Sequence, residues 1–211
     1  MYREARTSDL FTVPNIERGR SRSVSSELED LVAAEIFRHI SKCGKKIKIF
    51  IDQPISIKGY GKNGKSKSTY PDVIVCRETE TKYECIYLCD VKTDPGWNRN
   101  GLNELVKKHN EELVALKSFN FNMKSGTSRK ELYKEITFET CDCYDIVYIS
   151  SKNGSKKFQE DKNAINNLSI DSNRVFSLTD KYHPNGYDEA KPPILSPEFT
   201  EWIDRIKSKV N

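Results

Sequence analysis

The architecture follows from two strand-like runs, Thr69-Tyr70-Pro71-Asp72-Val73-Ile74-Val75-Cys76 and Tyr83-Glu84-Cys85-Ile86-Tyr87-Leu88-Cys89-Asp90-Val91-Lys92. Both runs are rich in β-branched and aromatic residues, which favour strands. Pro71 stands near the leading end of the first run, where a missing backbone donor is tolerated. Because only the polar segment 77–82 separates the two runs, the sequence predicts a β-hairpin.

The end of the second run combines charge with apolar neighbours. Side chains alternate between the faces of a strand, so Asp90 and Lys92 are expected on one face with Ile86 and Leu88. The opposite face then carries Tyr83, Cys85, Tyr87, Cys89 and Val91. A carboxylate and a lysine are costly to bury unless they pair or bind an ion. A salt bridge is the simpler interpretation of Asp-x-Lys alone, but Asp72, with 17 residues between it and Asp90, favours a shared site across the hairpin.

A helix is predicted over residues 25–40, just upstream of these strands. Ser26 is followed three residues later by Glu29, which is the capping-box spacing, and Gly44 stands beyond its end. Glu29 is a capping residue in the simplest account. Glu35 falls on the apolar stripe of the helix and is an alternative functional acid, with Glu27 a weaker one. His39 is on the same stripe and is interpreted as a polar core residue.

Pro71-Asp72 followed by Asp90-Val91-Lys92 resembles the signature of the PD-(D/E)xK nuclease superfamily, which includes many type II restriction endonucleases. The resemblance covers about residues 24 to 94. It implies an α/β fold with a mixed β-sheet flanked by helices and an αβββαβ core. It also implies a metal-dependent endodeoxyribonuclease that leaves 5′-phosphate and 3′-hydroxyl ends. A junction, repair, transposition or phage-related nuclease of the same fold, and a non-catalytic DNA-binding protein, remain alternatives.

The resemblance also assigns roles. Asp72 and Asp90 would bind Mg²⁺, the carbonyl of Val91 would add a further ligand, and Mn²⁺ is expected to substitute. Lys92 would position or deprotonate the attacking water, or neutralise charge on the phosphate. Glu29 would support a second metal or orient the first through a water. Its loss is therefore expected to be less damaging than the loss of Asp90.

Positive charge gathers before the first strand. Eight lysines and one acid, Asp52, lie between Lys42 and Lys67, and the part from 58 to 68 is also rich in glycine. Such a loop can follow a phosphate backbone, although an exposed hairpin tip made soluble by lysine is the simpler account. Its position directly before Asp72 favours contact with double-stranded DNA. The candidate DNA-binding residues are Lys58, Lys62, Lys65 and Lys67, with Trp97 and Arg99 in the turn-rich segment 93–101.

The remaining pattern continues one mixed sheet with flanking helices. A helix is predicted over 102–117, a strand over 144–150, a helix over 159–168 and a strand over 174–178. Ser196-Pro197 begins a last helix whose apolar stripe either closes the core or joins two subunits. That stripe comprises Phe199, Trp202, Ile203, Ile206 and Val210. A homodimer, with one active site for each DNA strand, is expected from the family.

Composition frames these expectations. The 211 residues, of which 36% are hydrophobic and 31% charged, with a net charge of +4, predict one domain over 23–211 after an N-terminal arm or irregular segment over 1–22. No run is long enough to cross a bilayer and no secretion signal is evident, so a cytoplasmic protein without a membrane partner is expected. The six cysteines lack a Cys-x-x-Cys motif and are interpreted as reduced structural thiols. The three histidines are too scattered to predict a ligand set.

Overall fold

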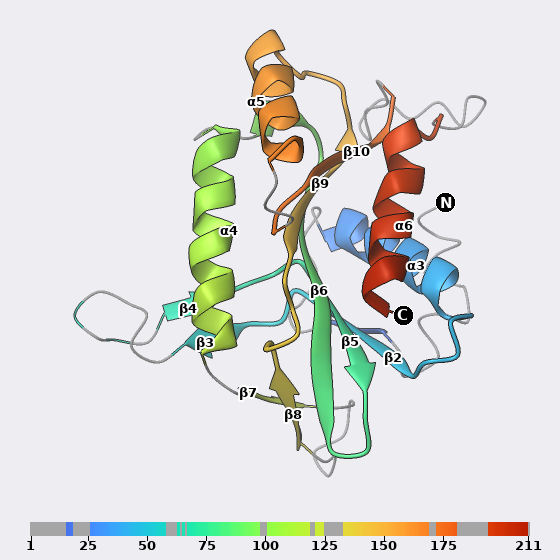
Figure 1. Cartoon of the computed structure of the whole chain (residues 1–211), viewed down its shortest axis with the longest axis vertical. Coiled ribbons are helices and arrows are strands. Elements are labelled where there is room, and N and C mark those ends of the chain that lie inside the picture. Colours follow the sequence, from blue (N-terminus) through green and yellow to red (C-terminus); the bar gives the residue numbers. More distant parts are fainter. Residues whose placement is uncertain are drawn as a thin grey trace.

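The protein is an α/β fold in which helices flank a mixed β-sheet. The computed structural model describes residues 16–18, 26–57, 63, 65, 67–97, 101–118, 121–124, 133–168, 172–180 and 194–210. Figure 1 shows α3 and α6 on one side of the sheet and α4 on the other, with α5 beside α4. The helices are α3 (Ser26–Ile40), the 3-10 turn η2 (Pro95–Trp97), α4 (Leu102–Lys117), α5 (Lys156–Asn166) and α6 (Pro197–Val210).

The long strand β6 organises the sheet. It pairs with β5 in the predicted antiparallel hairpin, which is confirmed, and β5 pairs in turn with β2. The first residues of β6 pair with β8 and its last residues with β9, both in parallel. The strands of this sheet are β1 (Ile16–Arg18), β2 (Ile47–Ile51), β5 (Val73–Glu78), β6 (Lys82–Lys92), β7 (Phe121–Lys124), β8 (Tyr133–Thr137), β9 (Tyr144–Ser150) and β10 (Val175–Thr179).

The predicted alternation of faces along β6 is wrong at one point, because the strand contains a β-bulge. Val75 is paired with Tyr87 but Cys76 with Cys85, so Ile86 is an extra residue without a partner on β5. Such an insertion reverses the alternation on one side of it. Ile86 therefore packs with Tyr87, Cys89 and Val91 toward α3 and α6, whereas Tyr83 and Cys85 pack with Leu88 toward α4. Beyond the bulge, Leu88, Asp90 and Lys92 keep the predicted spacing.

The last helix closes the core. Trp202, Ile203, Ile206 and Val210 of α6 are buried against the sheet and α3, with Phe199 partly buried beside them, which decides between the two roles predicted for this stripe. Polar contacts add to the apolar packing. Trp202 Nε1 donates to the hydroxyl of buried Tyr87 at 2.8 Å.

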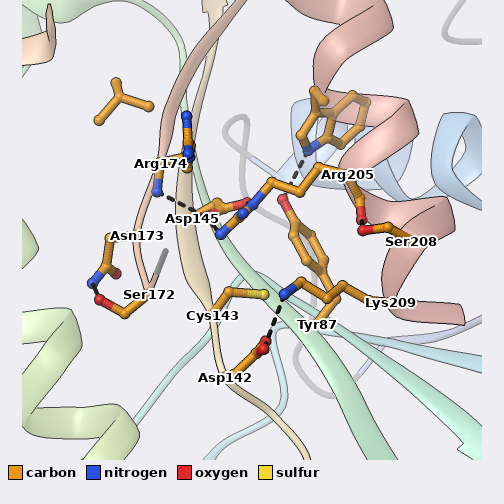
Figure 2. Close-up of polar contacts among 12 residues, drawn as sticks. Tyr87, Asp142, Cys143, Asp145, Ser172, Asn173, Arg174, Arg205, Ser208 and Lys209 are labelled. Atoms are coloured by element: carbon orange, nitrogen blue, oxygen red, sulfur yellow. Dashed lines mark hydrogen bonds and ion pairs between the residues drawn. The ribbon is translucent and has the colours of Figure 1, made fainter. Parts of the chain in front are cut away.

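A buried ion pair fixes α6 further along the sheet, as Figure 2 shows. Arg205 Nε donates to Asp145 Oδ2 at 2.7 Å, and Asp145 Oδ1 accepts the backbone N–H of Arg174 at 2.9 Å. Asp145 is fully buried, so the loss of Arg205 would leave a carboxylate without its counter-charge at a cost of about 3–5 kcal/mol. The two residues therefore belong to the scaffold.

Two further predictions meet the structure in part. Within the predicted N-terminal arm, Ile16–Arg18 form β1, which pairs in parallel with β2, and the rest of the arm lies outside the described residues. The cysteines are free thiols, of which Cys43 is half-buried and five are buried.

Among the described helices, none has the length and apolar character that crossing a membrane requires.

Candidate active site

The register of the hairpin brings the two predicted aspartates together. Val73 on β5 is paired with Cys89 on β6. Because partners in an antiparallel ladder move in opposite directions along the chain, Asp72 comes opposite Asp90. Asp72 Oδ2 also accepts the backbone N–H of Val91 at 2.7 Å. The N–H and the C=O of one strand residue point toward the same neighbour, so the Val91 carbonyl faces the side of Asp72 as well.

Lys92 completes the group. Its Nζ lies 2.5 Å from Asp90 Oδ1 and 3.9 Å from Asp72 Oδ2. The exposed fraction of the side chain is 16% for Asp72, 11% for Asp90 and 30% for Lys92. Solvent therefore reaches the lysine and touches both carboxylates, which makes the group a partly open site at the edge of the core.

The charges of this site oppose and compensate one another. Burial, followed by the neighbouring Asp90 carboxylate, raises the pKa of Asp72 well above its ordinary value. Burial also opposes charge on Asp90, but the hydrogen bond from His109 and the charge of Lys92 hold the pKa of Asp90 below its ordinary value. Against the opposing effect of burial, Asp90 and then Asp72 raise the pKa of Lys92. The ammonium thus partly offsets two carboxylates that repel each other.

Of the helix acids, Glu29 is the one tied to the site by its charge. The Glu29 carboxylate is among the groups that raise the pKa of Lys92. Glu35 is engaged on its own helix, where it pairs with Arg38 and lies 3.8 Å from His39 Nε2. His39 is not a core residue, because its side chain is 36% exposed. Glu27 is exposed.

The chemistry of the donors fits Mg²⁺. Asp72 and Asp90 supply hard carboxylate oxygens side by side, and their mutual repulsion is what a divalent cation would relieve. Over the described ranges no group of three or more His, Cys, Asp or Glu residues is arranged to hold a metal. The residues that could contribute to an octahedral shell here are therefore two carboxylates and one backbone carbonyl oxygen. Mg²⁺ ordinarily completes such a set with water and phosphate oxygens.

His109 is a site residue that sequence reasoning missed. It lies on α4, its side chain is 1% exposed, and its Nε2 is 3.4 Å from Asp90 Oδ2. The available signal was its position on the inward stripe of the predicted helix, between Leu102 and Leu113, which both pack inward. A histidine on an apolar stripe that faces a strand with Asp-x-Lys is a candidate partner of that aspartate.

The predicted DNA-binding residues are described only in part. Lys65 and Lys67 are exposed, and Lys67 begins β4 (Lys67–Thr69), which pairs with β3 (Ile55–Ile57) in a two-stranded sheet. Figure 1 shows this hairpin beside α4. The strand β4 leads directly into Asp72, so Lys67 is five residues from the site along the chain. Lys58, Lys62 and Arg99 lie outside the described residues, as does the side chain of Trp97.

Comparison of the chain with protein-family models, with curated proteins and with solved structures found no match. The class to which the structure assigns the chain is thus an α/β fold with a mixed sheet. The geometry of Asp72, Asp90 and Lys92 is therefore the main structural indication of a function.

Proposed function

We propose that the protein is a Mg²⁺-dependent endonuclease of the PD-(D/E)xK type, which hydrolyses DNA phosphodiester bonds and leaves 5′-phosphate and 3′-hydroxyl ends. One observation carries the proposal: two carboxylates and a lysine from adjacent antiparallel strands converge at a partly open edge of the core. The element order gives further support. α3, β2, β5, β6, α4 and β9 follow one another as αβββαβ, with β3–β4 and β7–β8 as insertions.

Each residue has a role in this proposal. Asp72 and Asp90 hold Mg²⁺, together with the Val91 carbonyl, and Mn²⁺ is expected to substitute. When bound there, the ion would polarise a phosphate and acidify a water. Lys92 has its ammonium within reach of both carboxylates, so it neutralises them before the metal binds and afterwards orients the attacking water or a phosphate oxygen. Glu29 acts on this site through its charge or through a water.

DNA reaches the site past the basic loop. Lys65 and Lys67 are exposed and precede Asp72 by seven and five residues, which supports a phosphate contact close to the site along the chain. The proposed active form is a homodimer, because a two-fold assembly places one site against each strand. A restriction-like enzyme is the first choice within this class. The choice among restriction, junction and repair activities depends on the DNA that is cut.

The decisive experiment offers several substrates to one protein. Supercoiled plasmid, linear duplex, branched DNA and RNA are incubated with Mg²⁺, with Mn²⁺ and with a chelator. Asp90→Ala is the test variant. Asp204→Asn is the matched control, since Asp204 is an exposed acid of α6 that pairs with Lys207 at 3.5 Å.

The expected result is metal-dependent cleavage of DNA by wild type and Asp204→Asn, and none by Asp90→Ala. Discrete fragments would indicate site-specific restriction, and cuts confined to branched DNA would indicate a junction nuclease. Retention of DNA without cleavage would favour the non-catalytic binding protein. Cleavage that survives Asp90→Ala or the chelator would remove the proposed site from the reaction.

A further inference from the structure

His109 lies on α4 and contacts the proposed metal site from that side of the sheet. Its Nε2 is 3.4 Å from Asp90 Oδ2, while Lys92 Nζ is 2.5 Å from the other carboxylate oxygen, Oδ1. The two oxygens of Asp90 therefore have different partners. Nothing in the roles of Asp72, Lys92 or Glu29 accounts for a buried imidazole at this position.

The imidazole ring is held in place. It stacks on Tyr144 with the ring centroids 4.0 Å apart and the planes 6° from parallel. Tyr144 is buried at the start of β9, where it is paired with Leu88 on β6, two residues before Asp90. Because the ring packs face to face between a helix and a strand, it cannot rotate without losing this stack. His109 is thus a rigid contact for Asp90, in contrast to the partly exposed Lys92.

The surroundings of His109 Nδ1 indicate that the proton of the imidazole is on Nε2. His109 Nδ1 is buried and has no hydrogen-bond partner in the described part of the chain. A buried N–H without an acceptor is more costly than a lone pair, and a carboxylate oxygen requires a donor opposite it. The tautomer with its proton on Nε2 satisfies both conditions. A protonated Nε2 donates to Asp90 and is not available as a metal ligand.

We infer that His109 is a positioning residue, which donates from Nε2 to Asp90 Oδ2 and so leaves Oδ1 as the oxygen that would bind the metal. This inference rests on the proposed function, since the oriented oxygen is the proposed Mg²⁺ ligand. Carboxylates that bind metals are commonly oriented by such outer hydrogen bonds, and the loss of one typically lowers affinity about 10–100-fold. Lys92 Nζ now lies 2.5 Å from Oδ1, so a metal held by that oxygen would replace this contact.

Two variants separate hydrogen bonding from packing. His109→Phe keeps an aromatic ring against Tyr144 but has no donor, whereas His109→Gln places an amide N–H near the position of Nε2. Glu111→Gln, an exposed position on the same helix, is the control. Circular dichroism establishes that each variant is folded. Calorimetric titration with Mg²⁺, and with Mn²⁺ followed by electron paramagnetic resonance, then measures metal affinity without any cleavage.

We expect His109→Phe to bind Mg²⁺ about 10–100-fold more weakly than wild type, His109→Gln to recover most of that loss, and Glu111→Gln to bind as wild type does. Equal affinity of His109→Phe and wild type would overturn the inference, as would a glutamine variant as weak as the phenylalanine variant. Nitrogen coupling to bound Mn²⁺ that disappears in His109→Phe would also overturn it, because His109 would then be a ligand.

A measurement on the metal-free protein keeps the inference apart from the nuclease proposal. Proton NMR of the wild type is expected to show a downfield, slowly exchanging imidazole N–H that is absent in His109→Phe and shifted in Asp90→Asn. If that signal is missing, the hydrogen bond does not exist. If the hydrogen bond and the metal effect are both found but no nucleic acid is cut, His109 keeps its role and the proposed function fails.

Discussion

The backbone N–H of Val91 donates to Asp72 Oδ2 at 2.7 Å, so the first aspartate is fastened to the strand that carries the second. This contact explains how a residue just outside β5 is held opposite Asp90. It also holds two carboxylates close together in a largely buried place, where they repel each other. A site of this kind is less stable without a cation than with one, and several consequences can be measured.

Asp72→Asn is expected to raise the stability of the metal-free protein and to lower its Mg²⁺-dependent cleavage. An asparagine oxygen can still accept the Val91 N–H, while the charge disfavoured by burial and by Asp90 is gone. We expect the metal-free variant to be more stable by about 1 kcal/mol, a rise in Tm of about 2–4 °C, as measured by thermal denaturation in chelator. Mg²⁺-dependent cleavage should fall by about 100-fold or more.

Asp90→Asn is the comparison for that experiment. The pKa of Asp90 is held below its ordinary value in the folded protein, so folding favours its charged form. Its replacement is therefore expected to lower the stability of the metal-free protein as well as to abolish cleavage. Equal effects of the two substitutions on stability would contradict the assignment of the disfavoured charge to Asp72.

Mg²⁺ should oppose the pH dependence that Asp72 gives to the stability of the metal-free protein. Because the pKa of Asp72 is raised above its ordinary value of 3.8, the folded state binds its proton more tightly than the unfolded state. Its contribution to stability is fully present below pH 3.8 and is lost as pH rises through the raised pKa of the folded protein. Mg²⁺ requires the deprotonated carboxylate, so the increase in Tm that Mg²⁺ causes should grow over the same range.

Differential scanning fluorimetry from about pH 4 to pH 8, with Mg²⁺ and with chelator, tests this response. Asp72→Asn serves as the reference, because it has no proton to lose at that position. In this variant the effect of Mg²⁺ on Tm should be small and should depend less on pH. An Mg²⁺ effect that is constant with pH in the wild type would rule out a raised pKa of Asp72.

Lys92→Met should weaken both the fold and the reaction. Methionine keeps much of the apolar stem but leaves Asp72 and Asp90 without the ammonium between them. For a partly exposed pair we expect a loss of about 1–2 kcal/mol from the free energy of unfolding in chelator, measured with urea. Cleavage should be abolished while DNA binding in Ca²⁺ is retained. Lys92→Arg should restore the stability but not the cleavage, whereas a cleaving Lys92→Met protein would exclude a catalytic role.

Sequence patterns predicted the elements around the site well. The spacing of Leu102, Leu113 and Leu116 predicted a helix whose bounds are those of α4, and the apolar runs before and after segment 77–82 predicted the hairpin of β5 and β6. Asp72 and Asp90 were predicted to share a site because a hairpin with a short connection brings the ends of its two strands together. These are local inferences, which depend on the periods of helices and strands.

Features that depend on the third dimension were not predictable in the same way. Strict alternation placed Ile86 with Leu88, but the bulge puts Ile86 on the opposite face, and no residue type marks such an insertion. His109 was set aside because the three histidines are too scattered along the sequence to predict a ligand set. Its partner Asp90 is on another element, so the contact follows only from how α4 packs on the sheet.

Glu29→Gln and Glu35→Gln should distinguish the two helix acids. Glu29 acts on Lys92 through its charge, whereas the partners of Glu35 are Arg38 and His39 on its own helix. We expect Glu29→Gln to lower the rate of cleavage about tenfold, which corresponds to about 1.4 kcal/mol in the activation free energy. Glu35→Gln should cleave at the wild-type rate. The reverse order of the two effects would assign the supporting role to Glu35.

Charge reversal in the basic loop tests the path of DNA. The double variant Lys65→Glu and Lys67→Glu alters the hairpin that leads into Asp72. The control is Lys42→Glu with Lys45→Glu, because these exposed lysines precede β2, whose first residue, Ile47, is paired with Arg77 at the end of β5 remote from Asp72.

Fluorescence anisotropy with a DNA duplex in Ca²⁺, at several salt concentrations, gives both the affinity and its salt dependence. A lysine that contacts phosphate contributes to the slope of log affinity against log salt by about one unit or less. We expect the Lys65 and Lys67 variant to bind more weakly at low salt and to lose about two units of slope, since two phosphate contacts are removed. Equal losses in the control pair would mean that DNA is attracted by the overall charge of the protein, and the route past β4 would then have no support.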